Sequence, residues 1–229
     1  MLAVKNVGRI SYSKALKLQE MILNHPSRVN VMLLLEHPPT YTAGRRMAYS
    51  ADEAERLKKL GAEYYSVKRG GQVTFHGPGQ LVGYPILDLR DFNLGVRSYI
   101  DNLQESLKLA CNRLGVNASL NECTGVWVDD RKIAALGVHV QRHLTTHGFA
   151  LNCTTDLSWF DNIVSCGINK PATSIAHEMC NLKPDFGIDS VTPVLLKSIS
   201  SVFNIETCPL DDVSRPFDAT IQSFLDRDS

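Results

Sequence analysis

The sequence lacks the features that would fit the protein for a membrane or for a nucleic acid. Its longest apolar run, residues 31–35, has only the length of a strand, so no segment is predicted to span a bilayer. The start carries no basic region followed by an apolar block and a cleavage site, so no secretory signal is predicted. The 24 Lys and Arg residues balance 24 Asp and Glu residues. A net charge of zero excludes a polyanion binder that works through excess positive charge.

Several motifs of common enzymes are also missing. There is no phosphate-binding loop of the Walker type, and there is no G-x-S-x-G elbow of a serine hydrolase. Gly77-Pro78-Gly79 resembles part of a dinucleotide fingerprint, but a strand-like stretch follows it where that fingerprint requires a helix. The six cysteines form no C-x-x-C pair. Without a secretory signal we interpret them as reduced thiols, which raises the question of whether one is a nucleophile.

The hydrophobic pattern predicts a single domain over residues 1–229, in which strands come in clusters separated by helices. This order favours an α+β fold over a doubly wound sheet, where strands and helices alternate strictly. Residues 209–229 are polar and are expected to fray. The predicted helices begin at Ser11, at a capping box of Ser50 and Glu53, at Ser98 and at Pro193, the last with proline in its first turn. The predicted strands cover residues 2–10, 29–35, 63–67, 72–75, 81–87, 125–128, 133–140 and 144–151.

Two groups of residues are candidates for a ligand site, and each also has an ordinary structural explanation. Four glycines in residues 69–80 allow the backbone to approach a ligand closely, or they form a hairpin that binds nothing. His139, His143 and His147 have the spacing of a metal-binding face on a helix. The residues around these histidines favour strands, on which the three rings need not converge. A metal site is therefore an alternative that we keep open, not our main interpretation.

Six blocks of the sequence stand out together, namely residues 69–80, 84–90, 124–127, 131–137, 146–152 and 163–167, followed by Thr173 and Ser174. In these blocks the chain resembles the octanoyltransferases of lipoic acid synthesis, also called lipoyl(octanoyl) transferases. The blocks follow the family's order, and several independent blocks are more specific than any single motif. Two positions depart from the family pattern: Ser165 stands where many members have proline, and Trp159 stands where bacterial members often have proline.

The resemblance implies a fold, a catalytic pair and an acyl pocket. The fold is a mixed, largely antiparallel sheet flanked by helices, as in biotin and lipoate protein ligases. Taken alone, Cys166 would be interpreted as a small core residue and Lys132 as an edge residue. In the family pattern these positions hold the nucleophile that carries an acyl thioester and the lysine that moves its protons. The residues matching the acyl pocket are Arg69, Gly70, Gly71, Gln72, Val73, Thr74, Phe75, His76, Ala135, Leu136, Gly137, Gly148, Phe149 and Ala150.

The implied activity is transfer of an octanoyl group from octanoyl-acyl carrier protein to a lysine of lipoyl domains. The implied acceptors are the E2 subunits of 2-oxoacid dehydrogenases and the glycine cleavage H protein. No ATP, cofactor or metal is expected, and a monomer is expected. The first nineteen residues contain four basic residues and no acid, which resembles a mitochondrial presequence. The family likeness begins near residue 2, however, which leaves little room for one. We expect the mitochondrion, with the cytoplasm as the alternative.

Three other functions remain open from the sequence. An ATP-dependent lipoate or biotin ligase would share the implied fold by analogy, but it would form an acyl-adenylate and need no cysteine nucleophile. The chain lacks the arginine- and glycine-rich loop that biotin ligases use. A non-catalytic scaffold or metal-binding module would use the three histidines named above. A generic cysteine–histidine protease is the weakest alternative, because no signature of one is present.

Overall fold

The computed structural model describes residues 1–26, 29–44, 51–67, 69–163, 170–179 and 184–227 of the chain. A seven-stranded sheet runs through the molecule in the order β10-β1-β2-β6-β9-β8-β7. Its two pairs at the β10 end are parallel and the other four are antiparallel. The sheet is therefore mixed and largely antiparallel, as expected. Its strands are β1 (Leu2–Arg9), β2 (Val31–Glu36), β6 (Gln80–Ile86), β7 (Val126–Val128), β8 (Arg131–Gln141), β9 (Leu144–Asn152) and β10 (Thr207–Pro209).

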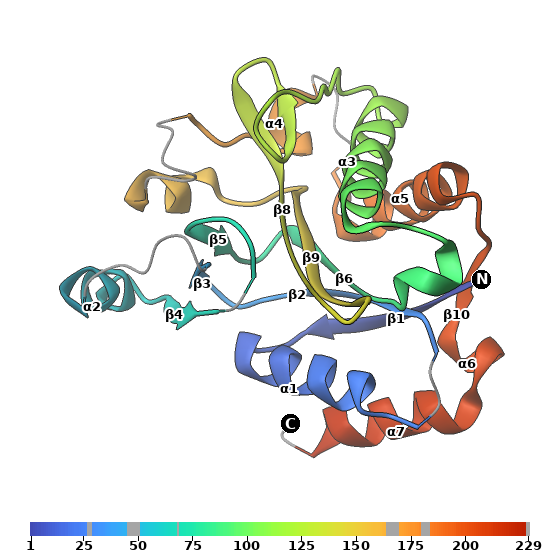
Figure 1. Cartoon of the computed structure of the whole chain (residues 1–229). Helices are drawn as coiled ribbons and strands as arrows, with labels where there is room; N and C mark the ends of the chain where they lie inside the picture. Colours follow the sequence, from blue (N-terminus) through green and yellow to red (C-terminus); the bar gives the residue numbers. More distant parts are fainter. Residues whose placement is uncertain (27–28, 45–50, 68, 164–169, 180–183, 228–229) are drawn as a thin grey trace.

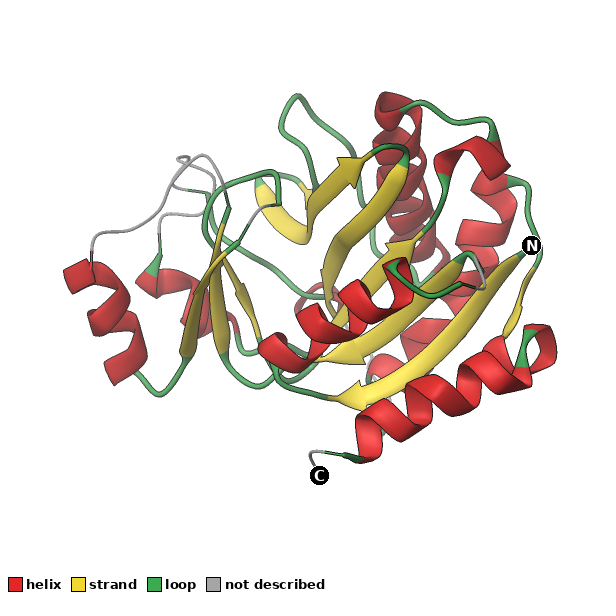
Figure 2. Cartoon of the chain, turned by 60° about the horizontal axis from the view of Figure 1, so that its bottom comes forward, coloured by secondary structure: helices red, strands yellow, loops and turns green. Residues whose placement is uncertain are grey.

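Helices cover both faces of this sheet (Figure 1, Figure 2). The long helices α3 (Val96–Arg113) and α5 (Ile188–Phe203) pack together over one face, where the main core lies. Helices α1 (Tyr12–Leu23) and α7 (Arg215–Asp226) cover the opposite face, where a second apolar cluster lies. Strand β2 is buried along most of its length because both of its faces meet helices. The short helices are α4 (Ile175–Glu178), α6 (Leu210–Val213) and the 3-10 turns η1 (Leu89–Phe92) and η2 (Leu157–Asn162).

A smaller sheet stands beside the large one and was only partly expected. It has the order β4-β3-β5, and it packs with α2 (Ala51–Lys59) and η2 around a third apolar cluster. Two of its strands, β4 (Glu63–Ser66) and β5 (Thr74–His76), lie close to predicted strands. The central strand β3 (Thr40–Ala43) was missed, because four residues between a proline pair and a glycine give no readable alternation. The predicted capping role of Ser50 lies outside the described residues.

Two expectations about the C-terminal part were wrong. The helix predicted from Pro193 begins five residues earlier at Ile188, so the proline sits inside α5 instead of in its first turn. Residues 209–226 do not fray: they form α6 and α7, and Phe217 and Ile221 are fully buried. The polar composition hid an amphipathic helix in which Phe217, Ile221, Phe224 and Leu225 face the apolar cluster on the sheet. Across the ranges that the structure describes, none of the helices is long and apolar enough to cross a membrane.

Candidate active site

Strands β8 and β9 form a hairpin with one face of small residues. The register pairs Ala135 with Ala150 and Gly137 with Gly148. Direct partners in an antiparallel pair share a face, and so do residues two apart along a strand. The four small residues therefore lie together on one face. The opposite face carries larger side chains such as that of Phe149, which packs into the main core. The small face leaves space beside the sheet that larger side chains would fill.

A glycine-rich loop that begins at Arg69 covers the outer edge of β8. The N–H of Gly70 donates to the carbonyl of Val138 at 3.1 Å, which pairs the loop with the edge of the strand. The Arg69 guanidinium holds the loop in shape. Its Nη1 donates to the carbonyls of Gly70 and Gln72, both at 2.9 Å, and its Nη2 donates to the carbonyl of Thr42 on β3 at 2.7 Å. The loop is thereby tied to both sheets.

Gly137 is needed for the close approach of this loop. A Cβ atom at this position would lie 2.8 Å from Cδ of Arg69 and 3.1 Å from the carbonyl oxygen of Gly70. Contacts that short are not tolerated without movement of the loop, so a residue without a Cβ is required. The aliphatic part of Arg69 consequently lies directly against the small face of the hairpin, where it bounds the space beside the sheet.

A cavity of about 750 Å³ lies between the small face, the glycine-rich loop and the first residues of β8. All the residues that the sequence assigns to an acyl pocket line this cavity except Phe75. The Phe75 ring packs instead against Tyr41 and Trp159, with ring centroids 5.3 and 5.1 Å apart. Its neighbours on β5, Thr74 and His76, do line the cavity. Successive strand residues point to opposite sides, so the middle residue of the three faces away.

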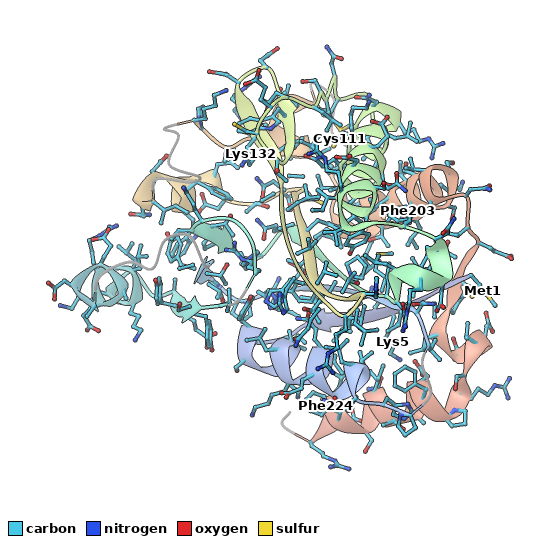
Figure 3. All side chains as sticks on the ribbon, viewed as in Figure 1. Met1, Lys5, Cys111, Lys132, Phe203 and Phe224 are labelled. Carbon is cyan, nitrogen blue, oxygen red and sulfur yellow. The ribbon has the colours of Figure 1, made fainter. Side chains whose placement is uncertain are left out.

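Lys132 lines the same cavity from the beginning of β8, and Figure 3 shows it near that end of the sheet, beside α4. Its Nζ lies 4.7 Å from the ring centroid of Trp127, its partner on β7, where the indole attracts the ammonium group. The Nζ of Lys170 lies 5.1 Å from the same ring. Gly125 has a φ of +139°, and a Cβ there would come within 3.2 Å of Cε of Lys132. The turn before β7 thus leaves room for this lysine.

The predicted nucleophile, Cys166, lies outside the described residues. Four other cysteines are described, and all four are free thiols. Burial raises the pKa of Cys111 to about 12, and burial likewise raises the pKa of Cys153. A thiol that stays protonated at neutral pH is a poor nucleophile, so these two belong to the core. Cys123 lines the cavity near Lys132, while Cys208 lies on β10 at the far edge of the sheet.

The cavity wall contains polar residues that the sequence analysis did not assign to the acyl pocket. Tyr12, the first residue of α1, lines the cavity together with Tyr84 and His147. Gln80 and Asn152 line it as well. For four of these five residues a signal was available, because Gln80, Tyr84, His147 and Asn152 stand in the family blocks 69–80, 84–90 and 146–152. Nothing in the sequence shows that strands so far apart along the chain bring these side chains to one place.

The buried histidines near the cavity are held neutral. Nδ1 of His37 donates to the carbonyl of Ile10 at 2.9 Å, because a carbonyl only accepts, and Nε2 accepts from the Tyr84 hydroxyl at 2.8 Å. Burial lowers the pKa of His37 to about 4. The pKa of His147 also falls to about 4, through burial and then through the charge of Arg69. Neither ring nitrogen of His147 has a hydrogen-bond partner among the described residues.

The stability of the protein is expected to fall as the pH drops below about 6.5, because unfolded His37 accepts a proton that the buried ring resists. The pKa of His37 is about 4 in the folded protein and 6.5 in the unfolded one. Its contribution to the free energy of unfolding is therefore fully present above pH 6.5 and is lost as the pH falls toward 4. The shift corresponds to about 3 kcal/mol. Urea unfolding across this range should show a smaller pH dependence in His37→Gln than in the wild type. The exposed His177 supplies the control His177→Gln, and equal slopes in all three proteins would contradict the prediction.

The three histidines considered as metal ligands occupy different positions around the β8–β9 hairpin. His139 is on β8, His143 is exposed in the turn, and His147 is buried on β9. In the described part of the chain, no three His, Cys, Asp or Glu side chains are grouped closely enough to hold a metal ion.

Residues 11–200 match the family described as lipoyl protein ligase A/B catalytic domain. The chain is 49% identical over 211 residues to the mitochondrial octanoyl-[acyl-carrier-protein]:protein N-octanoyltransferase of Danio rerio, covering 88% of this chain and 93% of that protein. It is 41% identical over 214 residues to an octanoyltransferase of the bacterium Solibacter usitatus, covering 90% and 94%.

Solved structures share the fold at low sequence identity. A lipoate-protein ligase A bound with ATP superimposes with a TM-score of 0.72 at 15% identity, covering 99% of this chain and 94% of that one. A biotin protein ligase from Aquifex aeolicus in complex with biotin and ATP gives a TM-score of 0.53 at 15% identity, covering 88% and 70%. The α+β arrangement of the biotin and lipoate protein ligases, expected from the sequence, is confirmed.

Proposed function

Because the chain belongs to the octanoyltransferases of the lipoyl protein ligase A/B catalytic domain family, we propose that it moves an octanoyl group from octanoyl-acyl carrier protein to a protein lysine. It is an acyltransferase. We propose lipoyl domains as acceptors, namely those of 2-oxoacid dehydrogenase E2 subunits and of the glycine cleavage H protein. The route is a thioester acyl-enzyme on Cys166, with Lys132 as the group that moves protons.

The observation that carries this proposal is the position of Lys132. Its side chain lines the same cavity as the small face of the β8–β9 hairpin. An acyl chain lying along that face would place its carbonyl end at the lysine and its methyl end toward the glycine-rich loop. An extended octanoyl chain of six methylenes gains about 5 kcal/mol from burial. A cavity of about 750 Å³ has room for it.

The first proposed half-reaction exchanges one thioester for another. The Cys166 thiolate attacks the carbonyl carbon of the octanoyl thioester, and the bond from that carbon to the carrier protein's sulfur breaks. The departing thiolate takes a proton from the Lys132 ammonium group, so the carrier protein leaves as a thiol. The bond formed and the bond broken are of the same type, so no ATP is needed. This half-reaction leaves Lys132 neutral.

The second proposed half-reaction forms an amide. The amine of the acceptor lysine attacks the carbonyl carbon of the acyl-enzyme, and the bond to Sγ of Cys166 breaks. Neutral Lys132 takes the proton that the attacking nitrogen must lose, and the Cys166 thiolate is regenerated. An amide is more stable than a thioester, so the free energy change of this half-reaction favours the overall transfer. One lysine thus donates a proton in the first half and accepts one in the second.

Ala135→Phe is expected to shift the preference of the enzyme from octanoyl to shorter acyl chains. Ala135 lies on the small face and lines the cavity, so a phenyl ring there would occupy the path of the chain. Rates with carrier proteins bearing acyl groups of different lengths measure the effect. Val140→Phe, on the same strand but with its side chain packed against the main core, is the control. An unchanged preference for octanoyl in Ala135→Phe would show that the acyl chain does not lie along this face.

We also propose the mitochondrion as the compartment, because the Danio rerio relative is mitochondrial. A bacterial relative of comparable identity makes the cytoplasm the alternative. Fractionation of the cells that make the protein, followed by detection with an antibody, distinguishes the two.

The proposed function is tested by the mass of the protein after mixing with octanoyl-acyl carrier protein in the absence of ATP. We expect one octanoyl adduct, located on the peptide containing Cys166 and removed when a lipoyl domain is added. The acceptor should gain the same mass. If instead the acceptor is modified only when free octanoate and ATP are supplied, the protein is a ligase and the proposal is wrong.

A further inference from the structure

A chain of buried hydrogen-bonded side chains runs through the cavity wall. Nη2 of Arg69 donates to Oγ1 of Thr42 at 2.6 Å, and that hydroxyl lies 3.2 Å from Nε2 of His76. Nδ1 of His76 lies 2.9 Å from Oε1 of Gln80, and Nε2 of Gln80 donates to Oδ1 of Asn152 at 2.9 Å. All five residues are buried. They come from the glycine-rich loop, β3, β5, β6 and β9, so the chain crosses from the small sheet to the large one.

The chain continues to the backbone of Lys132. Nδ2 of Asn152 donates to the carbonyl of Thr173 at 2.8 Å. The N–H of Thr173 donates to the carbonyl of Lys132, and the N–H of Lys132 donates to the carbonyl of Pro171, both at 2.9 Å. Ala172 thereby forms an isolated parallel bridge with Lys132. The segment 171–173 is therefore fastened on one side to Lys132 and on the other to Asn152.

Backbone carbonyls fix the direction of every hydrogen bond in this chain. Nε2 of Gln80 also donates to the carbonyl of Phe75 at 3.1 Å. A carbonyl only accepts, so Phe75 sets the orientation of the Gln80 amide, and Thr173 sets that of Asn152 in the same way. With Oε1 of Gln80 as an acceptor, Nδ1 of His76 must carry its hydrogen. Nε2 of His76 then accepts from the Thr42 hydroxyl.

This series of hydrogen bonds also requires a neutral His76. A protonated ring would present a second N–H toward the Thr42 hydroxyl, which already accepts from Arg69, and the hydrogen of that hydroxyl would lose its acceptor on His76. Burial lowers the pKa of His76 well below 6.5, and the neighbouring His37 and Arg69 lower it further. Because every member is buried and paired, removing one donor leaves its buried partner without that hydrogen bond. These hydrogen bonds can be satisfied in one arrangement only, which holds the glycine-rich loop and the segment 171–173 at fixed positions.

We infer that Gln80 and Asn152 are positioning residues that hold the segment 171–173 against Lys132 and so set the place of its amine in the cavity. They act through the Lys132 backbone and take no proton in the reaction. The inference rests on the proposed role of Lys132. The inference also gives His76 a role beyond lining the cavity, because its ring connects the glycine-rich loop, through Thr42, to the Gln80 amide.

Asn152→Asp is the direct test. Aspartate keeps the shape and still accepts from Gln80, but an ionised oxygen then faces the Thr173 carbonyl in place of a donor. We expect kcat to fall about 100-fold, the size of effect known for misplacement by about 1 Å, while KM for octanoyl-acyl carrier protein changes little. A protonated carboxyl group donates again, so the ratio of variant to wild-type kcat should rise as the pH is lowered. A residue needed only for folding would show no such recovery.

A second variant and a control make the outcome decisive. Gln80→Glu removes the donor to Phe75 and Asn152 and should show the same recovery at low pH. Asn6→Asp is the control, since exposed Asn6 keeps its accepting role toward the N–H of Gly8 at 3.0 Å. Rates are expressed per acyl-enzyme formed in the burst phase, so the folded fraction does not affect them. Wild-type kcat in both variants, or a loss without recovery, overturns the inference, whereas a wild type that forms no acyl-enzyme overturns the proposed function itself.

Discussion

Lys132→Ala is expected to slow octanoyl transfer about 1,000-fold, within the usual contribution of a general acid–base group. The lysine is proposed to protonate the departing thiolate and then to deprotonate the attacking amine, so both half-reactions should slow. Single-turnover measurements separate them: acylation is followed by the octanoyl adduct on the enzyme, and transfer by its loss when a lipoyl domain is added. Trp127 should remain buried in the variant, because its indole N–H donates to the Cys123 carbonyl at 3.1 Å and does not depend on the lysine.

The matched control is Lys58→Ala, which removes an exposed lysine of α2. It should transfer octanoyl at the wild-type rate. Wild-type rates of both half-reactions in Lys132→Ala would show that this lysine takes no part in the mechanism. A loss confined to the second half-reaction would limit its role to accepting the proton from the amine, and the first half-reaction would then need another proton donor.

Cys166→Ser is expected to have the largest effect, a loss on the order of 10,000-fold or more, as seen when a nucleophile is removed from a covalent mechanism. A serine hydroxyl is far less acidic than a thiol, so the nucleophilic anion would be scarce near neutral pH. The mass of the variant should show no octanoyl adduct after mixing with octanoyl-acyl carrier protein. The position rests on the family resemblance, because residue 166 is outside the described ranges.

Cys208→Ser is the matched control for the nucleophile. Cys208 lies on β10, at the edge of the sheet opposite β7, and the variant should form the adduct as the wild type does. An adduct in Cys166→Ser, or transfer at the wild-type rate, would show that another group carries the acyl chain. Cys123, which lines the cavity, would then be the next residue to examine.

The strands and helices of the large sheet could be predicted because their apolar periodicity is long and regular. The β8–β9 hairpin, whose observed strands extend each predicted range by only one or two residues at an end, is the clearest case. β3 and β10 were missed because each is only three or four residues long and has proline beside or within it, so no alternation of apolar and polar residues could be read. α7 was missed because its buried side, formed by Phe217 and Ile221, is narrow within a polar segment.

The candidate site was found through family motifs, which mark residues close in sequence. Those motifs gave Lys132, the glycine-rich loop and the small face, and all of these line one cavity. They could not show that Phe75 points away from it, because a motif carries no information on the side to which a strand residue points. Nor could they show the hydrogen bonds from Gln80 through Asn152 to Thr173, which join residues up to 72 positions apart and depend on the tertiary fold.

Side chains alternate between the two faces of β8, so the register of this strand determines both which residues face the acyl cavity and which face the main core. Ala135 and Gly137 face one way, while Leu136 and Val138 pack toward the main core. Inserting or deleting one residue would exchange these sets, placing branched side chains on the small face and small residues toward the main core. Evolution can therefore retune the length of the bound acyl chain by substitution, one position at a time. Changes in the length of this hairpin strand remove binding and stability together.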